Sequence, residues 1–376
     1  MTPELFIGLM SGTSMDGIDG VLINLAPGAD FHVLNHCHQP FHDGLRDCLM
    51  ALNQPGDNEL HRAALAANGL ALAYADVVSV LLRQSGLRSA DVRAIGAHGQ
   101  TVRHQPGAFD GLGYTCQLLN GAVLAERSGI DVVCDFRSRD VAAGGQGAPL
   151  VPAFHQAAFG GSGVDTAVLN IGGIANITFL PVAGPVGGLD CGPGNVLLDT
   201  WCLQHTGQPY DRDGAWAKSG QLHPELLAKW LQDSYIQQCP PKSTGRDHYN
   251  QAWLTTQLKA PDNLPIAIAA ADVQNTLVHL TVQAAVQELR RGMPTTNRLL
   301  VCGGGVYNRY MMDSLKAALP GVLVAPVNQA GRLDPMHVEA AAFAWLAKAH
   351  LDRRTANCPD VTGASGPKLL GACYPA

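Results

Sequence analysis

The amino-acid sequence predicts a mixed α/β protein with two domains. Its 376 residues are enough to build two domains with sizeable hydrophobic cores. Short apolar segments typical of strands alternate with segments of helical periodicity, which indicates βαβ units and a largely parallel sheet. A strand, a glycine-containing turn and a second strand are predicted at residues 6–23 and again at 166–180. Each half of the chain is therefore expected to begin with a β-hairpin.

The first hairpin has a turn of small polar residues that holds two aspartates, Asp16 and Asp19. Glycine, serine and threonine allow backbone N–H groups and hydroxyls to close around an anion without side-chain bulk. One or two carboxylates are enough to hold a Mg²⁺ ion that keeps most of its waters. The turn therefore favours a nucleotide-using enzyme, and the alternative is a tight hairpin whose glycines serve geometry alone.

Composition excludes several other classes of protein. With 47% hydrophobic and 15% charged residues the chain is an ordinary globular protein, and its net charge of −6 argues against general nucleic-acid binding. The ten cysteines include no Cys-x-x-Cys pair and are expected to be reduced, as in a cytoplasmic enzyme. No signal peptide or membrane span is predicted. The cluster formed by His36, Cys37, His38 and His42 fits no standard zinc spacing.

The remaining elements follow in chain order. In the first half we expect a helix at 59–82 that stops at Gly86, a strand at 92–97, a helix at 118–127 and a strand at 130–134. Residues 137–152 fit no long regular element and are interpreted as an inter-domain crossover loop. In the second half we expect a Gly-rich turn at 188–195 leading into a helix at 196–203, a helix at 269–291, a strand at 298–302 ending in three glycines, and a helix at 337–351 before a coil-like tail.

No P-loop and no complete dinucleotide fingerprint occurs, so the glycine clusters require another nucleotide-binding fold. Three elements resemble the actin/hexokinase/Hsp70 ATPase superfamily: the hairpin at 8–20, the Asp-x-Gly segment at 190–192 and the glycines at 303–305. The resemblance implies a two-domain actin-like ATPase (ribonuclease H-like) fold with a nucleotide cleft between the domains. We place the domains at 1–140 and 141–376, and expect the last helix to pack back on the first domain.

Longer motifs resemble one family within this superfamily, the anhydro-N-acetylmuramic acid kinases. They lie at residues 8–17, 97–101, 140–150, 169–173, 190–195, 242–246, 302–305 and 358–364. The family uses ATP and water to open the 1,6-anhydro ring of anhydro-N-acetylmuramic acid and to phosphorylate it to N-acetylmuramate 6-phosphate, in the recycling of cell-wall fragments. The segment 118–121 departs from the expected turn and leaves a substrate role for Asn120 open.

The resemblance also implies which residues form the site. The predicted ATP-binding residues are Gly12, Thr13, Ser14, Met15, Asp16, Gly17, Ile18, Asp19, Gly303, Gly304 and Gly305. Asp16 and Asp19 are the predicted Mg²⁺ ligands. Arg139, Glu339 and Gln100 are the predicted substrate-binding residues, because a guanidinium fits the lactyl carboxylate bidentately and Glu339 can reach sugar hydroxyls. For Glu339 the alternative is an ordinary surface acid in the first turn of a helix.

Asp190 is the predicted catalytic base. Ring opening needs a water molecule that loses a proton as it attacks the anomeric carbon, and a carboxylate can accept that proton. We expect Asp190 to lie in a Gly-rich turn that enters a helix, where the helix dipole keeps it ionised. The alternatives are a helix N-cap or a Mg²⁺ ligand.

The sequence also has features of three rival functions. The segment 12–15 is similar to the nucleophile segment of subtilisin-like proteases, but the Asp16 that follows disfavours an anionic transition state there. The others are another sugar or acyl kinase of the superfamily and an ATP-hydrolysing regulatory module. The expected ligand is a small amino sugar, and neither nucleic acid nor a membrane is an expected partner. A homodimer is compatible with the sequence.

Overall fold

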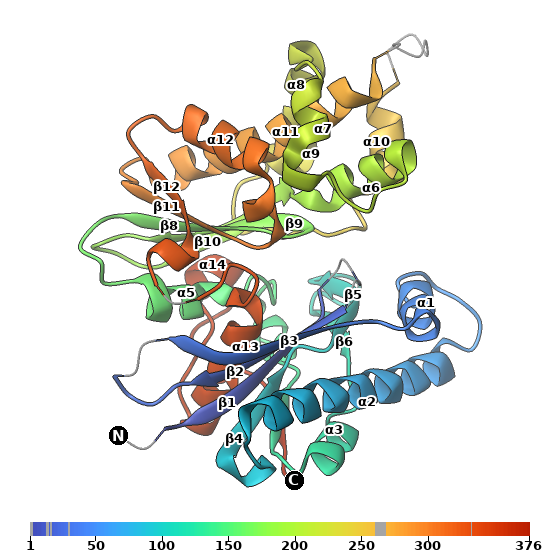
Figure 1. Ribbon diagram of the computed structural model, residues 1–376, viewed down its shortest axis with the longest axis vertical. Coiled ribbons are helices and arrows are strands. Elements are labelled where there is room, and N and C mark those ends of the chain that lie inside the picture. The colour runs from blue at the N-terminus through green and yellow to red at the C-terminus, as the bar shows by residue number, and fades with distance from the viewer. Residues whose placement is uncertain (1–2, 13–14, 16, 29–30, 260–267, 332) are drawn as a thin grey trace. The chain divides into compact units, whose positions relative to one another are not determined.

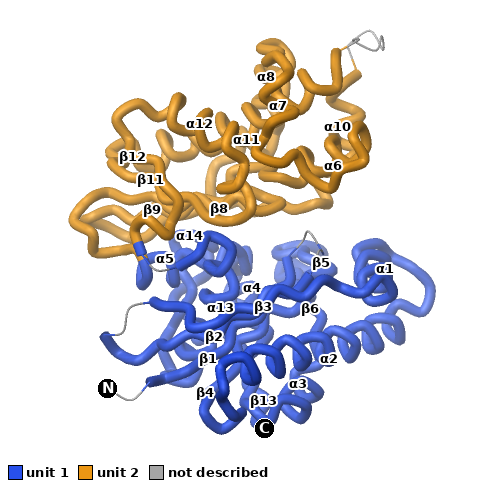
Figure 2. The backbone as a smooth tube through the Cα atoms, in the orientation of Figure 1, with its two compact units in different colours: residues 1–158, 331–376 blue, residues 159–330 orange. Residues whose placement is uncertain are grey.

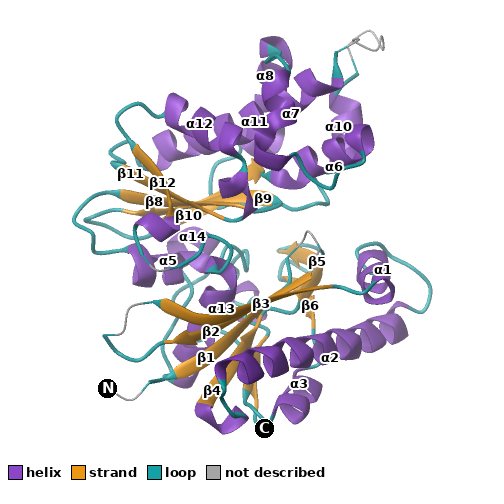
Figure 3. Ribbon diagram, in the orientation of Figure 1, coloured by secondary structure: helices purple, strands orange, loops and turns teal. Residues whose placement is uncertain are grey.

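The computed structural model describes residues 3–12, 15, 17–28, 31–259, 268–331 and 333–376. The chain divides into two compact units (Figure 2): unit 1 comprises Met1–Ala158 and Gly331–Ala376, and unit 2 comprises Phe159–Ala330. Strands and helices occur in both units, which confirms the α/β class (Figure 3).

Unit 1 is built on a six-stranded sheet (Figure 1). Its strands are β1 (Leu5–Met10), β2 (Gly17–Asn24), β3 (His32–Pro40), β4 (Val92–Ala97), β7 (Val132–Cys134) and β13 (Ala372–Tyr374), and β5 (Gln100–Pro106) pairs separately with β6 (Gly113–Leu118). Its helices are α1 (Asp43–Ala51), α2 (Glu59–Ser85), α3 (Gly121–Ser128), α4 (Ser138–Val141), α5 (Val151–Phe159), α13 (Val338–Leu351) and α14 (Pro359–Thr362), with a 3-10 turn at Ser89–Asp91. The strand order is β13-β7-β4-β1-β2-β3.

Unit 2 is built on a five-stranded sheet of order β10-β9-β8-β11-β12. The strands are β8 (Thr166–Ile171), β9 (Ile174–Leu180), β10 (Gly187–Pro193), β11 (Arg298–Cys302) and β12 (Leu323–Pro326). The helices are α6 (Asn195–Thr206), α7 (Ala215–Ser219), α8 (Pro224–Leu231), α9 (Ser234–Gln237), α10 (Gln251–Gln257), α11 (Ala270–Gly292) and α12 (Arg309–Ala318), with 3-10 turns at Arg212–Gly214, Gly304–Tyr307 and Val327–Gln329.

The two sheets share a five-stranded arrangement, to which unit 1 adds the antiparallel strand β13. In each, the first three strands form an antiparallel meander, and the first strand is also paired in parallel with the next strand of the sheet, β4 in unit 1 and β11 in unit 2. A further parallel strand follows on that side, β7 or β12. This repeated arrangement confirms the two-domain fold that the superfamily resemblance implies. The prediction of a largely parallel sheet was wrong, because each opening hairpin adds antiparallel strands to the parallel half.

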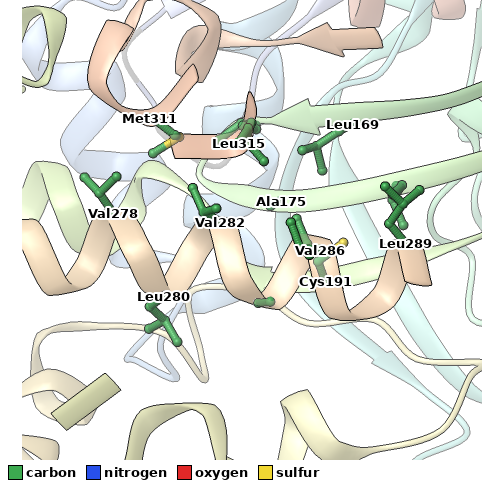
Figure 4. Close-up of a cluster of buried hydrophobic side chains, with 14 of the residues drawn as sticks. Leu169, Ala175, Cys191, Val278, Leu280, Val282, Val286, Leu289, Met311 and Leu315 are labelled. Carbon is green, nitrogen blue, oxygen red and sulfur yellow. The ribbon is translucent and has the colours of Figure 1, made fainter. Parts of the chain in front are cut away.

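The core of unit 2 lies between its sheet and α11 (Figure 4). Val278, Val282 and Val286 recur every four residues along one face of this helix, and each is at most 1% exposed. They belong to the same buried cluster as Leu169 and Cys191 from the sheet. Burial of each such side chain contributes about 1.5–3 kcal/mol to folding. Glu288, on the same helix, is also buried.

Helix α13 packs directly on the middle of the unit 1 sheet, against β1 and β4. Two glycines make this approach possible. A Cβ at Gly8 would lie 1.8 Å from the Ala340 carbonyl oxygen, and a Cβ at Gly96 would lie 1.9 Å from that of Phe343. The helix backbone therefore touches the strand backbone, an approach that only glycine permits.

The first division between the units falls after Ala158, and the expected boundary at 140/141 differs from it. The reason is a buried carboxylate. Asp140 is fully buried and accepts hydrogen bonds from the Gly147 amide at 2.8 Å, the Asn357 side-chain amide at 2.8 Å and the Thr362 hydroxyl at 2.9 Å. These bonds hold the supposed crossover loop inside unit 1, against a C-terminal segment that forms α14 and β13 instead of the expected coil.

Helix α2 is the one described helix that is long and apolar enough to cross a membrane. Leu70, Tyr74 and Leu81 on this helix are fully buried and belong to the core cluster of unit 1. Such packing is typical of a core helix. A core helix can be as long and as apolar as a membrane-spanning helix.

Candidate active site

The tip of the first hairpin is held by the segment that follows β4. The Gln100 side-chain amide donates to the Gly12 carbonyl at 3.1 Å, and the Ser11 hydroxyl bonds to the Tyr74 hydroxyl at 2.9 Å and to the Gly99 carbonyl at 3.1 Å. Buried polar contacts of this kind fix a loop because leaving any partner unsatisfied is costly. Thr13, Ser14 and Asp16 of the predicted ATP-binding set lie outside the described residues.

The other hairpin residues differ in what they can offer a nucleotide. Met15 and Ile18 are at most 2% exposed and belong to the core cluster of unit 1. They can therefore contribute only backbone groups. Asp19 is partly exposed, and its carboxylate accepts from Nδ1 of His38 on the neighbouring strand at 2.8 Å. A carboxylate with this exposure fits a hydrated Mg²⁺ ion.

The loop that carries Arg139 is tied to the end of β4 through a histidine. The Arg137 guanidinium donates to Nε2 of His98 at 3.0 and 3.2 Å and to the Gly147 carbonyl at 2.8 Å. Burial, helped by the Arg137 charge, lowers the pKa of His98 to about 3, so the imidazole is neutral and can accept these bonds. His98 was not predicted as a site residue, although it lies in one of the family motifs, and Arg137, one of two loop arginines that could bind an anionic group, instead holds this histidine.

The structure separates the predicted substrate-binding residues by exposure. Arg139 is exposed on α4, whereas Glu339 is half-buried in the first turn of α13. Gln100 is fully buried, and its described role is to hold the Gly12 carbonyl. Asn120 caps α3 by accepting from the Val123 amide at 3.1 Å and donates to the Asn68 side chain at 2.7 Å, which accounts for it structurally.

Asp190 lies in strand β10 of unit 2, and the expectation of a turn at a helix N-terminus was wrong. The cap of α6 is Gly194, so the N-cap alternative is excluded too. Pairing with β9 draws the Gly-rich segment into the sheet, with a bulge between Asp190 and Gly192. The Asp190 carboxylate is 7% exposed and accepts from the Thr244 amide at 3.0 Å. A backbone donor, not a helix dipole, stabilises its charge.

Asp190 and the glycines at 303–305 lie at the same end of the unit 2 sheet. Cross-strand pairing joins Asp190 to Asn176, Asn176 to Asn170, and Asn170 to Cys302, the residue before the glycines. Gly303 has a φ of +77°, and a Cβ there would lie 2.4 Å from the Asn170 side-chain oxygen. The tip of the second hairpin is at this end as well, because the Asn195 amide donates to the Gly172 carbonyl at 2.8 Å.

Among solved structures, a ROK family glucokinase from Streptomyces griseus in complex with glucose and AMPPNP covers 92% of this chain and 99% of its own at 13% identity, with a TM-score of 0.43. A reductive activator for a corrinoid, iron-sulfur protein covers 94% of this chain and 62% of its own at 12% identity, with a TM-score of 0.49. Likenesses this remote carry no inference about substrate.

Sequence relatives are much closer. Anhydro-N-acetylmuramic acid kinase from Variovorax paradoxus is 56% identical over all of both chains, and that from Nitrosomonas europaea is 47% identical over 99% of both. The protein named so from Cupriavidus pinatubonensis is 55% identical over 99% of this chain and 98% of its own. The family model of anhydro-N-acetylmuramic acid kinase matches residues 4–376. The chain therefore belongs to the anhydro-N-acetylmuramic acid kinase family.

Proposed function

We propose that this protein opens the ring of 1,6-anhydro-N-acetylmuramic acid with water and transfers the γ-phosphoryl group of ATP to the oxygen released. The observation that carries the proposal is Asp190, a buried carboxylate oriented by the Thr244 amide at the end of the sheet where the glycine segments lie. Family membership along the whole chain supports the choice of substrate.

Asp190 acts as general base. Its carboxylate takes a proton from water while the water oxygen bonds to the anomeric carbon and the bond from that carbon to O6 breaks. The O6 atom then attacks the γ-phosphorus, and ADP leaves. The proton stays on Asp190 until bulk water removes it. Ring opening and phosphorylation are coupled because the acceptor oxygen is freed only as the ring opens.

The hairpin of unit 1 and the glycines of unit 2 supply the ATP contacts. Of the described residues, Gly12, Met15 and 17–19 offer backbone N–H groups to the phosphates, and Gly303 to Gly305 form the adenosine side. Asp19, together with Asp16, would hold Mg²⁺, which when bound neutralises charge on the phosphates. A nucleotide cleft between the domains, a homodimer and a cytoplasmic location stay predictions.

Asp19→Asn is expected to raise the Mg²⁺ concentration that gives half-maximal activity, together with KM for ATP. The change removes one carboxylate charge from a partly exposed side chain, so the melting temperature should stay close to that of the parent protein. Titrating activity against Mg²⁺ and ATP measures the effect. Asp43→Asn, in the first turn of α1, is the matched control. Unchanged Mg²⁺ and ATP kinetics in Asp19→Asn would defeat the assignment.

Arg139→Ala is expected to weaken sugar binding by about 1.5–3 kcal/mol, roughly 10- to 100-fold in KM, with little effect on ATP. The lost contact is a charge-assisted bond to the lactyl carboxylate. A 1,6-anhydro sugar without the lactyl group is the chemical control, since the parent protein and the variant should handle it alike. Arg88→Ala controls for loss of an exposed arginine. A parental KM for the lactyl sugar would show that the contact is absent.

An ADP-release assay with 1,6-anhydro-N-acetylmuramic acid tests the proposed function itself. ADP should form only when the anhydro sugar is present, at one ADP for each sugar phosphate. ADP release driven instead by N-acetylmuramic acid or another open-ring sugar would indicate a kinase acting on an ordinary hydroxyl. Release without any sugar would indicate an ATP-hydrolysing module.

A further inference from the structure

The loop formed by residues 242–250 of unit 2 is anchored at both ends by buried polar contacts. At its start, the Lys242 ammonium is fully buried and donates to Glu288 Oε1 on α11 at 2.9 Å. The same ammonium donates to the Tyr235 carbonyl at 3.2 Å and the Ile236 carbonyl at 3.1 Å. One cation thus joins the loop, α9 and α11.

The other end of the loop is anchored on Asp233, the N-cap of α9. This carboxylate accepts from the Tyr249 hydroxyl at 3.1 Å, Nε1 of Trp253 at 2.9 Å and Nε2 of His248 at 3.1 Å. These bonds to the charged form lower the pKa of Asp233 against the effect of burial, so it is an anion at neutral pH. Both anchors are therefore charged groups with several bonds each.

Between the anchors the loop touches the catalytic carboxylate. The Thr244 amide donates to Asp190 Oδ2 at 3.0 Å, two residues after Lys242. From α9, the Tyr235 hydroxyl donates to the Asp190 backbone carbonyl at 2.9 Å. Lys242 therefore holds two of the segments that contact Asp190: the loop through its own backbone, and α9 through the Tyr235 carbonyl.

Stability alone does not account for this arrangement. Taking a lysine and a glutamate out of water costs about as much as their attraction returns, and an apolar pair of similar volume often stabilises a fold as well or better. The lysine–glutamate pair differs from an apolar pair because its hydrogen bonds are directional. They fix the position of the loop backbone, which apolar contacts do not.

We propose that Lys242, through Glu288, is a positioning residue for the reaction: it sets the loop so that the Thr244 amide orients Asp190 toward the attacking water. The proposal rests on Asp190 being the general base of the proposed function. Lys242 itself touches neither sugar nor ATP in this role.

The charged and titratable groups around Asp190 belong to the same arrangement. Tyr235 from α9, Cys191 from β10 and Glu288 from α11 interact electrostatically with one another, and Asp190 and Lys242 take part as well. Burial raises the pKa of Cys191 and that of Tyr235 far above neutral pH, so both groups are uncharged there. Lys242 is a cation of this group, and Glu288 is its ion-pair partner.

A double-mutant cycle between Lys242→Met and Asp190→Asn tests the proposal. In the parent background Lys242→Met is expected to lower kcat about 10- to 100-fold, the size of one lost charge-assisted hydrogen bond, with KM for ATP unchanged. In the Asp190→Asn background the same change is expected to cost less than about 3-fold, because the group it positions no longer accepts a proton. Arg291→Gln, which loses a 2.9 Å bond to the same Glu288 oxygen from the exposed side, should leave kcat unchanged.

A second pair of variants keeps the test valid if Lys242→Met folds poorly. Thr244→Ala retains the backbone amide and is the reference for Thr244→Pro, which removes the donor. Thr244→Pro should lower kcat about 10-fold or more and move the acid limb of its pH profile upward, because the Asp190 anion loses a stabilising bond.

The outcomes separate the two proposals. Equal losses from Lys242→Met in both backgrounds, or equal effects of the two Thr244 variants, would overturn the positioning role while leaving the kinase assignment intact. A parent protein without anhydro-sugar kinase activity, or full activity in Asp190→Asn, would overturn the proposed function instead.

Discussion

Asp190→Asn is expected to lower kcat by about 10²–10⁴-fold while leaving KM for ATP and for the anhydro sugar nearly unchanged. Asparagine keeps the shape of the side chain and an oxygen that can accept from the Thr244 amide, but it cannot take a proton from water. The loss should therefore fall on the chemical step and not on substrate binding. Steady-state kinetics of sugar-dependent ADP release measure it.

An isotope experiment shows whether the reaction is the one assigned to Asp190. In ¹⁸O-water the label should enter the anomeric hydroxyl of the sugar product and should be absent from phosphate. Asp211→Asn is a matched control, because it alters a carboxylate of unit 2 that accepts from the Trp216 and Ala217 amides and that has no place in the proposed chemistry. Label in phosphate without a sugar product would mean plain ATP hydrolysis, and the kinase assignment would then be abandoned.

Long periodic segments were predictable from sequence because their local pattern and their tertiary role agree. The helices expected at 59–82 and 269–291 are α2 (Glu59–Ser85) and α11 (Ala270–Gly292), and the strand expected at 298–302 is β11. The two hairpins were predictable for the same reason, since apolar runs flank each turn. In these segments one face is buried along its whole length. The apolar residues on that face therefore recur at a regular spacing in the sequence, which makes the element predictable.

Other strands exist only because a neighbour pairs with them. Strand β3 alternates exposed and half-buried residues and contains three histidines, so it has little apolar signal, yet it forms the edge of the sheet beside β2. Strand β10 contains glycine and proline that indicate a turn, but pairing with β9 draws it into the sheet. Strand β6 extends to Leu118, which delays the helix expected at 118–127 until Gly121. Tertiary pairing overrides local propensity at each of these places.

The candidate site also combines residues that the sequence could predict with partners that only the tertiary structure brings together. Motifs located Asp190, Asp19 and the glycines at 303–305, because the chemistry requires those residue types. The partners that orient them are remote in sequence: Lys242 and Glu288 are 46 residues apart, and His98 and Arg137 are 39 apart. No spacing rule connects such pairs. The motif at 242–246 marked the loop, and only the fold shows that its lysine points inward.

Gly96→Ala is expected to lower the stability of unit 1 by about 1–3 kcal/mol or more, because its new Cβ would lie 1.9 Å from the Phe343 carbonyl oxygen and 2.5 Å from the carbonyl carbon. These are backbone atoms inside α13, so no side-chain rotation relieves the overlap and the helix must move off the sheet. A fall in melting temperature of about 5–10 °C should result. Because Glu339 lies in the first turn of α13, KM for the sugar should rise as well.

The control for this prediction is Gly44→Ala in α1, where the nearest atom to the new Cβ would be Nδ1 of His42 at 3.8 Å. That change should leave the melting temperature unchanged or raise it slightly, since alanine is favoured over glycine in a helix by about 0.5–1 kcal/mol. Thermal melts of the two variants beside the parent protein separate backbone overlap from the mere addition of a methyl group. If Gly96→Ala and Gly44→Ala had the same melting temperature, the close packing of α13 against β4 would be contradicted.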